Sequence, residues 1–113
     1  MSFTIYHNPR CSKSREALAL LEAEGIKPKV VEYLAEPPSE TELLLLISIL
    51  DAPFASLVRS KDEKYRKLNF DLSTKESVAK HLALHPELLE RPIVVKNNRA
   101  VLGRPPENIK KLF

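Results

Sequence analysis

Cysteine and glycine are scarce in this sequence of 113 residues, and it has no long apolar run. Its single cysteine excludes an intramolecular disulfide, and neither of its two glycines opens a phosphate-binding loop of the kind that holds nucleotides. The longest apolar stretch, 43–50, is far shorter than the roughly 20 residues that span a bilayer. The three histidines are scattered, with no partner at metal-ligand spacing, so we expect no metal site.

The composition fits one soluble domain with a modest core. Hydrophobic residues make up 43% of the chain and charged residues 29%, and the formal net charge is +3. This mild charge suits a small anionic ligand and does not require nucleic acid. We expect a single domain over residues 1–113 and, because there is no disulfide framework or secretory signal, a reducing cytoplasmic location without membrane contact. The chain is expected to be a monomer, since no heptad pattern or long apolar edge is visible.

The hydrophobic periodicity predicts strands over 3–7, 29–34, 91–95 and 99–102. It predicts helices over 12–24, 39–50, 73–84 and 105–113, with shorter helices and turns over 53–68. Capping boxes are expected at Ser39/Glu42 and Ser73/Glu76, and the last helix is expected to direct Ile109, Leu112 and Phe113 to one side. The order βαβ, helical insertion (about 37–88), ββα predicts an α/β thioredoxin-like fold with a four-stranded mixed sheet. Pro92, which opens the third strand, is the expected cis-proline of that fold.

Cys11 stands between the first strand and the first helix, in the segment His7-Asn8-Pro9-Arg10-Cys11-Ser12-Lys13-Ser14-Arg15. At a helix N-terminus, unpaired N–H groups and the positive end of the dipole favour a thiolate. Arg10, Lys13 and Arg15 add positive charge around it. The same geometry binds oxyanions, so this segment predicts thiol chemistry on an oxyanion.

Three segments together resemble one protein family, the glutaredoxin-coupled arsenate reductases of the ArsC family. The first is the cysteine segment, the second is Arg91-Pro92-Ile93-Val94-Val95, and the third is Leu102-Gly103-Arg104-Pro105-Pro106-Glu107. The resemblance covers essentially the whole chain. The Cys-Ser-Lys-Ser-Arg sequence is similar to that of a chromosomal branch of the family.

The resemblance implies that Cys11 is the nucleophile that attacks arsenate. It implies that Arg59, Arg91 and Arg104 bind the oxyanion, and that His7 and Ser14 support ionisation of the cysteine. Arg15 is a further candidate for substrate binding. Since a single cysteine cannot resolve its own arsenic adduct, we expect glutathione as co-substrate and a glutaredoxin as partner, with no bound cofactor.

Simpler interpretations stay open for several of these residues. Arg59 lies in a charged segment that is equally typical of a solvated helix face, and Arg15 is equally able to pair with a nearby glutamate. His7 is equally compatible with a packed strand position. Among the histidines, His81 and His85 are expected to be structural or exposed.

Other functions are compatible with parts of the pattern. Cys11 and Ser14 form a monothiol CxxS motif, as in glutathione-dependent thiol transferases, but that reaction does not need three arginines. Reduction of another oxyanion and an inactive relative also remain open, as does a redox regulator of RNA polymerase with this fold, although such regulators usually carry CxxC. The cysteine count excludes three-cysteine reductases coupled to thioredoxin, and Ala17 stands where a low-molecular-weight phosphatase needs arginine.

Overall fold

A computed structural model describes residues 2–113. Its elements run in the order β1 (Phe3–His7), α1 (Ser12–Ala23), β2 (Lys29–Glu32), α2 (Glu40–Ile49), η1 (Phe54–Leu57), α3 (Glu63–Leu68), α4 (Lys75–Leu84), η2 (Pro86–Leu88), β3 (Ile93–Lys96), β4 (Arg99–Leu102) and η3 (Pro106–Leu112), where η denotes a 3₁₀ helix. The predicted order is confirmed, although the second strand ends at Glu32 rather than residue 34, and the third begins at Ile93, after Pro92, rather than at residue 91.

The four strands form one mixed sheet in the order β2-β1-β3-β4. Strand β1 pairs in parallel with β2 and antiparallel with β3, and β3 pairs antiparallel with β4. The parallel pair follows from the crossover through α1, and the antiparallel pair from the tight turn at Asn97, whose φ is +54°. The thioredoxin-like α/β fold is therefore confirmed.

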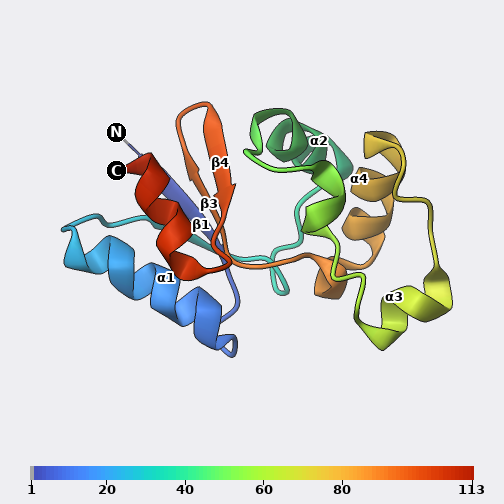
Figure 1. Ribbon diagram of the computed structural model, residues 1–113, viewed down its shortest axis with the longest axis horizontal. Helices are drawn as coiled ribbons and strands as arrows, with labels where there is room; N and C mark the ends of the chain where they lie inside the picture. The colour runs from blue at the N-terminus through green and yellow to red at the C-terminus, as the bar shows by residue number, and fades with distance from the viewer. Residues whose placement is uncertain (1) are drawn as a thin grey trace.

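The sheet separates two hydrophobic cores. Alternate strand residues point to opposite faces, so Ile5 and Val94 pack with Leu21 under α1 and η3, whereas Ile93 and Ala100 pack against the helical insertion. Figure 1 shows α1 and the C-terminal η3 side by side at one end of the molecule, with α2, α3 and α4 at the other. None of the helices in the described part of the chain is long and apolar enough to cross a membrane.

One of the two predicted helix caps needs correction. Thr74, not Ser73, caps α4, because its hydroxyl accepts from the Ser77 amide at 3.2 Å while the Ser73 amide donates to Asp71 Oδ1 at 2.8 Å in a preceding turn. The expected cap of α2 is confirmed, since Ser39 accepts from the Glu42 amide at 3.1 Å.

The C-terminal helix is a 3₁₀ helix rather than an α-helix. With three residues per turn, Ile109 and Leu112 share a face and are buried, whereas Phe113 is turned away and is 45% exposed. The prediction that all three share one side is therefore wrong for Phe113. Pro105 at the N-cap and Pro106 at the first position of this helix leave the start of the helix without two amide donors.

The Arg91–Pro92 peptide bond is cis, as predicted, and the Arg104–Pro105 bond is a second cis bond that the sequence analysis missed. Gly103 packs directly on this region. Its amide donates to the Pro92 carbonyl at 2.9 Å, and a Cβ added to Gly103 would lie 2.8 Å from Pro92 Cγ and 3.3 Å from Ile109 Cγ2. Only glycine allows these two segments to approach so closely.

Gly103→Ala should therefore destabilise the fold. The new methyl group would collide with a proline ring that cannot rotate away, and overpacking of this kind costs about 1–3 kcal/mol. Thermal unfolding would show the loss as a lower Tm than that of the wild type. An unchanged Tm would contradict the close packing of Gly103 on Pro92.

Candidate active site

Cys11 occupies the N-cap position of α1, as the sequence predicts. Its backbone is extended (φ −92°, ψ 122°), its amide donates to the Asn8 carbonyl at 3.0 Å, and its carbonyl accepts from the Arg15 amide at 3.0 Å. The side chain is partly exposed. Because the first amides of a helix have no partner within the helix, this position directs N–H groups towards the thiol.

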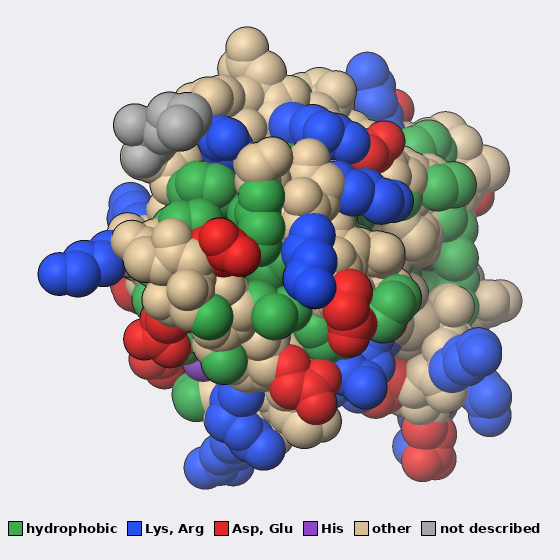
Figure 2. Space-filling view, turned by 60° about the vertical axis from the view of Figure 1, so that its left-hand side comes forward, with side chains coloured by type: hydrophobic (Ala, Val, Ile, Leu, Met, Phe, Trp, Pro, Cys, Tyr) green, Lys and Arg blue, Asp and Glu red, His purple; other side chains and the backbone are tan. Residues whose placement is uncertain are grey.

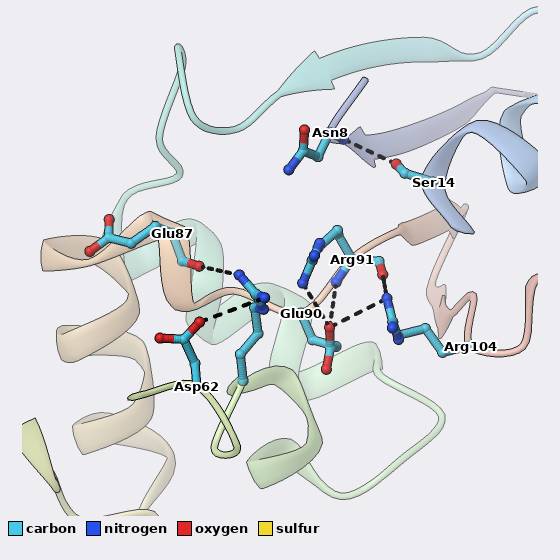
Figure 3. A network of polar contacts seen from close by, with 8 residues as sticks. Asn8, Ser14, Asp62, Glu87, Glu90, Arg91 and Arg104 are labelled. Carbon is cyan, nitrogen blue, oxygen red and sulfur yellow. Dashed lines mark hydrogen bonds and ion pairs between the residues drawn. The ribbon is translucent and has the colours of Figure 1, made fainter. Parts of the chain in front are cut away.

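The loop before α1 is held by a buried contact between His7 and Ser14. The Ser14 Oγ lies 2.7 Å from His7 Nδ1 and accepts from the Asn8 amide at 3.0 Å. Ser14 is fully buried and His7 is 5% exposed. Figure 3 shows the Asn8 and Ser14 contact at the start of α1. The structure thus places both predicted residues beside the cysteine loop, where they fix its shape.

Burial lowers the pKa of His7, an effect that Glu32 opposes and Arg15 reinforces. A lowered pKa favours the neutral imidazole at neutral pH. His7 is therefore suited to a hydrogen bond with Ser14 rather than to an ion pair with a thiolate.

The pKa of the Cys11 thiol is lowered. Burial, the largest single influence, raises the pKa, but four other influences together outweigh it. The nearby amides of Ser14 and Lys13, the charge of Arg91, and the Arg104 side chain all favour the thiolate and so lower the pKa. The expected helix-start effect is present, and the side-chain charges that matter come from Arg91 and Arg104 rather than from the residues that flank Cys11.

Arg91 and Arg104 are brought together by the contact between Pro92 and Gly103. Each arginine precedes a cis-proline, and the Arg104 Nη1 donates to the Arg91 carbonyl at 2.9 Å. Within residues 2–113, the buried Nε of Arg91 is the one side-chain nitrogen or oxygen that is fully buried without a hydrogen-bond partner. A buried N–H without an acceptor is costly, so its presence at this point favours an anionic ligand.

Arg59 lies in one cleft with Arg91 and Arg104, because two segments that are distant in the sequence pair beside it. Val58 and Leu89 form an isolated antiparallel bridge, and the Arg59 amide donates to the Leu88 carbonyl at 2.8 Å. The Arg59 Nη1 donates to the Glu87 carbonyl at 3.2 Å, and its Nη2 lies 3.7 Å from Asp62 Oδ2. A single open cleft is lined by Arg59, Arg91 and Arg104, together with the acidic residues Asp62, Glu63 and Glu90.

Two residues at the site were missed by the sequence analysis. The Glu90 Oε1 lies 3.4 Å from Arg91 Nη1 and 3.7 Å from Arg104 Nη1, as Figure 3 shows. Tyr33, which is 1% exposed, has its pKa raised by burial, an effect opposed by Arg91 and Arg59 and reinforced by Cys11. An acidic residue directly before a predicted anion-binding arginine was the available signal for Glu90.

Arg15 has a partner inside the loop. Its Nη1 donates to the Pro9 carbonyl at 3.0 Å, and it is not among the cleft-lining arginines. A role in substrate binding therefore stays a prediction without a supporting contact. In the described part of the chain, no group of three or more His, Cys, Asp or Glu side chains is arranged to hold a metal ion.

Charged side chains of both signs are interspersed on the surface. On the face shown in Figure 2, Lys and Arg alternate with Asp and Glu instead of forming one basic patch.

Known proteins match this chain over nearly its full length. The arsenate reductase of Neisseria meningitidis serogroup A is 47% identical over 112 residues, which cover 96% of each chain. The arsenate reductase of Haemophilus influenzae is 45% identical over 117 residues, with complete coverage of both chains. The structure of an arsenate reductase from Vibrio cholerae superposes with a TM-score of 0.89 at 45% identity and covers 100% of this chain and 98% of that one.

The model of the ArsC family matches residues 6–112, a range that includes the thiol loop, the insertion and all three cleft arginines. The match thus spans the fold, the cysteine loop and the arginines of the cleft, of which Arg91 and Arg104 act on Cys11. On this basis the chain belongs to the ArsC family.

Proposed function

We propose that this protein reduces arsenate to arsenite, with Cys11 as the nucleophile. The observation that carries the proposal is a thiol of lowered pKa beside Arg91 and Arg104, where a buried guanidinium Nε lacks a partner. Relatives named as arsenate reductases at 45–47% identity support the same activity.

The three cleft arginines offset the repulsion between two anions. Arsenate carries negative charge near neutral pH, and attack by a thiolate brings a second negative charge to it. Guanidinium groups stay ionised and offer several donors in a fixed plane, so Arg59, Arg91 and Arg104 can hold the oxyanion while Cys11 approaches. The amides at the start of α1 add donors that need no reorganisation.

His7 and Ser14 act in this scheme as positioning residues. The Ser14 hydroxyl fixes the Asn8 amide and contacts His7, and the Ser14 amide itself faces the thiol. Since the first turn of α1 must stay in place for its amides to stabilise the thiolate, these two buried side chains support ionisation through the loop. This agrees with the role that the family resemblance implies.

The reaction requires two electrons from outside thiols. The Cys11 thiolate forms a sulfur–arsenic bond and one arsenate oxygen leaves as water. Glutathione then bonds to arsenic with loss of a second water. A glutaredoxin thiol takes the glutathione sulfur, so a disulfide forms and two electrons stay on arsenic. Hydrolysis releases arsenite and Cys11, and the sum is arsenate plus two thiols giving arsenite, one disulfide and water.

The cysteine count requires an outside thiol, and glutathione as co-substrate with a glutaredoxin as partner is the simplest source of it. The chain has one cysteine, and Ser14, at the position of a resolving cysteine in CxxC proteins, is buried against His7. No thiol of this chain can therefore release the adduct. Dependence on reduced thiols is consistent with a cytoplasmic protein.

Cys11→Ser should abolish arsenate-dependent turnover. A hydroxyl at this position is not ionised near neutral pH and forms no sulfur–arsenic bond. The measurement is NADPH oxidation in a mixture of arsenate, glutathione, glutathione reductase and glutaredoxin, with arsenate omitted as the control. Residual arsenate-dependent oxidation by the variant would contradict the single-thiol mechanism. An inactive wild type with a reactive thiol would assign the site to another substrate.

Arg104→Ala should raise the pKa of Cys11. The substitution removes a side chain that favours the thiolate, so the pH profile of alkylation by iodoacetamide shifts to higher pH, towards the ordinary thiol value of about 8.5. Arg10→Ala is the matched control, because Arg10 adjoins Cys11 in sequence but does not lower its pKa. Equal shifts in both variants would show that charge near Cys11 in sequence matters, rather than the folded arrangement.

A further inference from the structure

Among the three carboxylates that line the cleft, Glu90 is the one that contacts both Arg91 and Arg104. Its Oε1 lies between Arg91 Nη1, at 3.4 Å, and Arg104 Nη1, at 3.7 Å, and the side chain is 21% exposed. Figure 3 shows the two guanidinium groups directed at the same carboxylate. The reaction scheme assigns this negative charge no role, and it lies where it would repel any oxyanion held by the two arginines.

The position of Glu90 is fixed by its backbone. The Glu90 amide donates to the Leu57 carbonyl at 2.7 Å, next to the bridge between Val58 and Leu89. Leu57 and Leu89 are both fully buried, so this segment is anchored in the core. The carboxylate is thus held at the cleft by the same pairing that brings Arg59 to it.

The contacts of Glu90 with the two arginines are long. Charge-assisted hydrogen bonds between guanidinium and carboxylate are typically about 2.7–2.9 Å long, shorter than both contacts here. The Arg91 Nε is also without a partner. Because the contacts with Glu90 are long and the Arg91 and Arg104 side chains are 15% and 36% exposed, donors remain for an oxyanion while Glu90 stays in place, and the bound oxyanion then has a carboxylate oxygen as its neighbour.

We propose that Glu90 determines which oxyanions the site accepts, by admitting tetrahedral oxyanions that carry a proton and rejecting those that carry none. Hydrogen arsenate and hydrogen phosphate each have an O–H group at neutral pH, which can donate to the Glu90 carboxylate. Sulfate has the same shape but no proton, so it meets an uncompensated negative charge. A site with a fixed acceptor discriminates strongly against a ligand that lacks the matching donor.

This inference rests on the proposed function, because it takes the arginine cleft as the oxyanion site. Its test uses anion binding rather than turnover. Phosphate and sulfate are probes that bind without undergoing the proposed reaction. Each can be titrated for its protection of Cys11 against iodoacetamide. Ionic strength is held constant with chloride, because salt screens these charges.

Glu90→Gln is the central variant. Glutamine keeps the size of the side chain and an acceptor for phosphate, but it removes the charge and offers an N–H donor to sulfate. In the wild type, the sulfate concentration that protects Cys11 should be at least about tenfold higher than the phosphate concentration that does so. In the variant, this sulfate-to-phosphate ratio of protecting concentrations should fall by about tenfold. Glu90→Ala should lower the ratio as well.

Glu63→Gln is the matched control. It removes the same charge from the rim of the same cleft, but Glu63 pairs with Lys67 at 3.5 Å rather than with the two arginines. The control should bind both anions slightly better and keep the ratio of the wild type. A ratio that falls equally in Glu63→Gln and Glu90→Gln would overturn the inference, because general charge would then explain the effect.

The remaining outcomes separate this inference from the proposed function. If wild-type protein binds phosphate and Glu90→Gln tightens both anions by the same factor, Glu90 is a simple competitor and the inference fails while the oxyanion site stands. Equal protection by phosphate and sulfate in the wild type overturns it too. If neither anion protects Cys11 in the wild type, both the inference and the proposed oxyanion site fail.

Discussion

The contact between Gly103 and Pro92 is the constraint on which the rest of the site depends. It holds the start of β3 and the end of β4 so close that no side chain fits between them. At each of these two ends an arginine directly precedes a cis-proline. Because Arg104 then donates to the backbone of Arg91, the two guanidinium groups form a unit on one side of the cysteine loop. A hairpin with a wider separation at this end would leave Cys11 with its helix amides alone.

The helical insertion contributes to the site through a single short pairing. The bridge between Val58 and Leu89 connects the segment after η1 to the segment before β3, and it brings Arg59 and Glu90 to one cleft. This pairing therefore places an attractive and a repulsive group in one cleft, which is a common way to obtain specificity for one ligand over others of similar shape.

Much of this arrangement could be predicted from the sequence. Strand alternation, the glycine after α1 and the position of Pro92 were sufficient for the order of the elements and for a four-stranded mixed sheet, because each depends on local periodicity or backbone restriction. The Cys11 loop and the three arginine segments were found from motifs. The capping residue of α4 was misplaced by one position because Ser73 and Thr74 are chemically equivalent as caps, and only the preceding turn at Asp71 decides between them.

The details that could not be predicted are those that depend on side chains from distant segments. The charges flanking Cys11 in sequence are conspicuous, but the structure assigns the pKa effect to Arg91 and Arg104. Glu90 and Tyr33 carry no motif of their own. Likewise, helix type at the C-terminus depends on whether the turn contains three residues or 3.6, and this small difference moves Phe113 to the surface.

The lowered pKa of Cys11 also couples the chemistry of the thiol to the folding of the whole chain. The arginines that favour the thiolate reach it only in the folded protein, so an unfolded chain has an ordinary thiol with a pKa of about 8.5. Between the folded pKa and this value the unfolded chain binds more protons, and stability therefore rises with pH across that interval and is lost as pH falls through the folded pKa. At a pH below about 8.5, rapid reaction of the thiol is consequently a property of folded molecules only. The reactivity of Cys11 therefore reports whether the chain is in its native state.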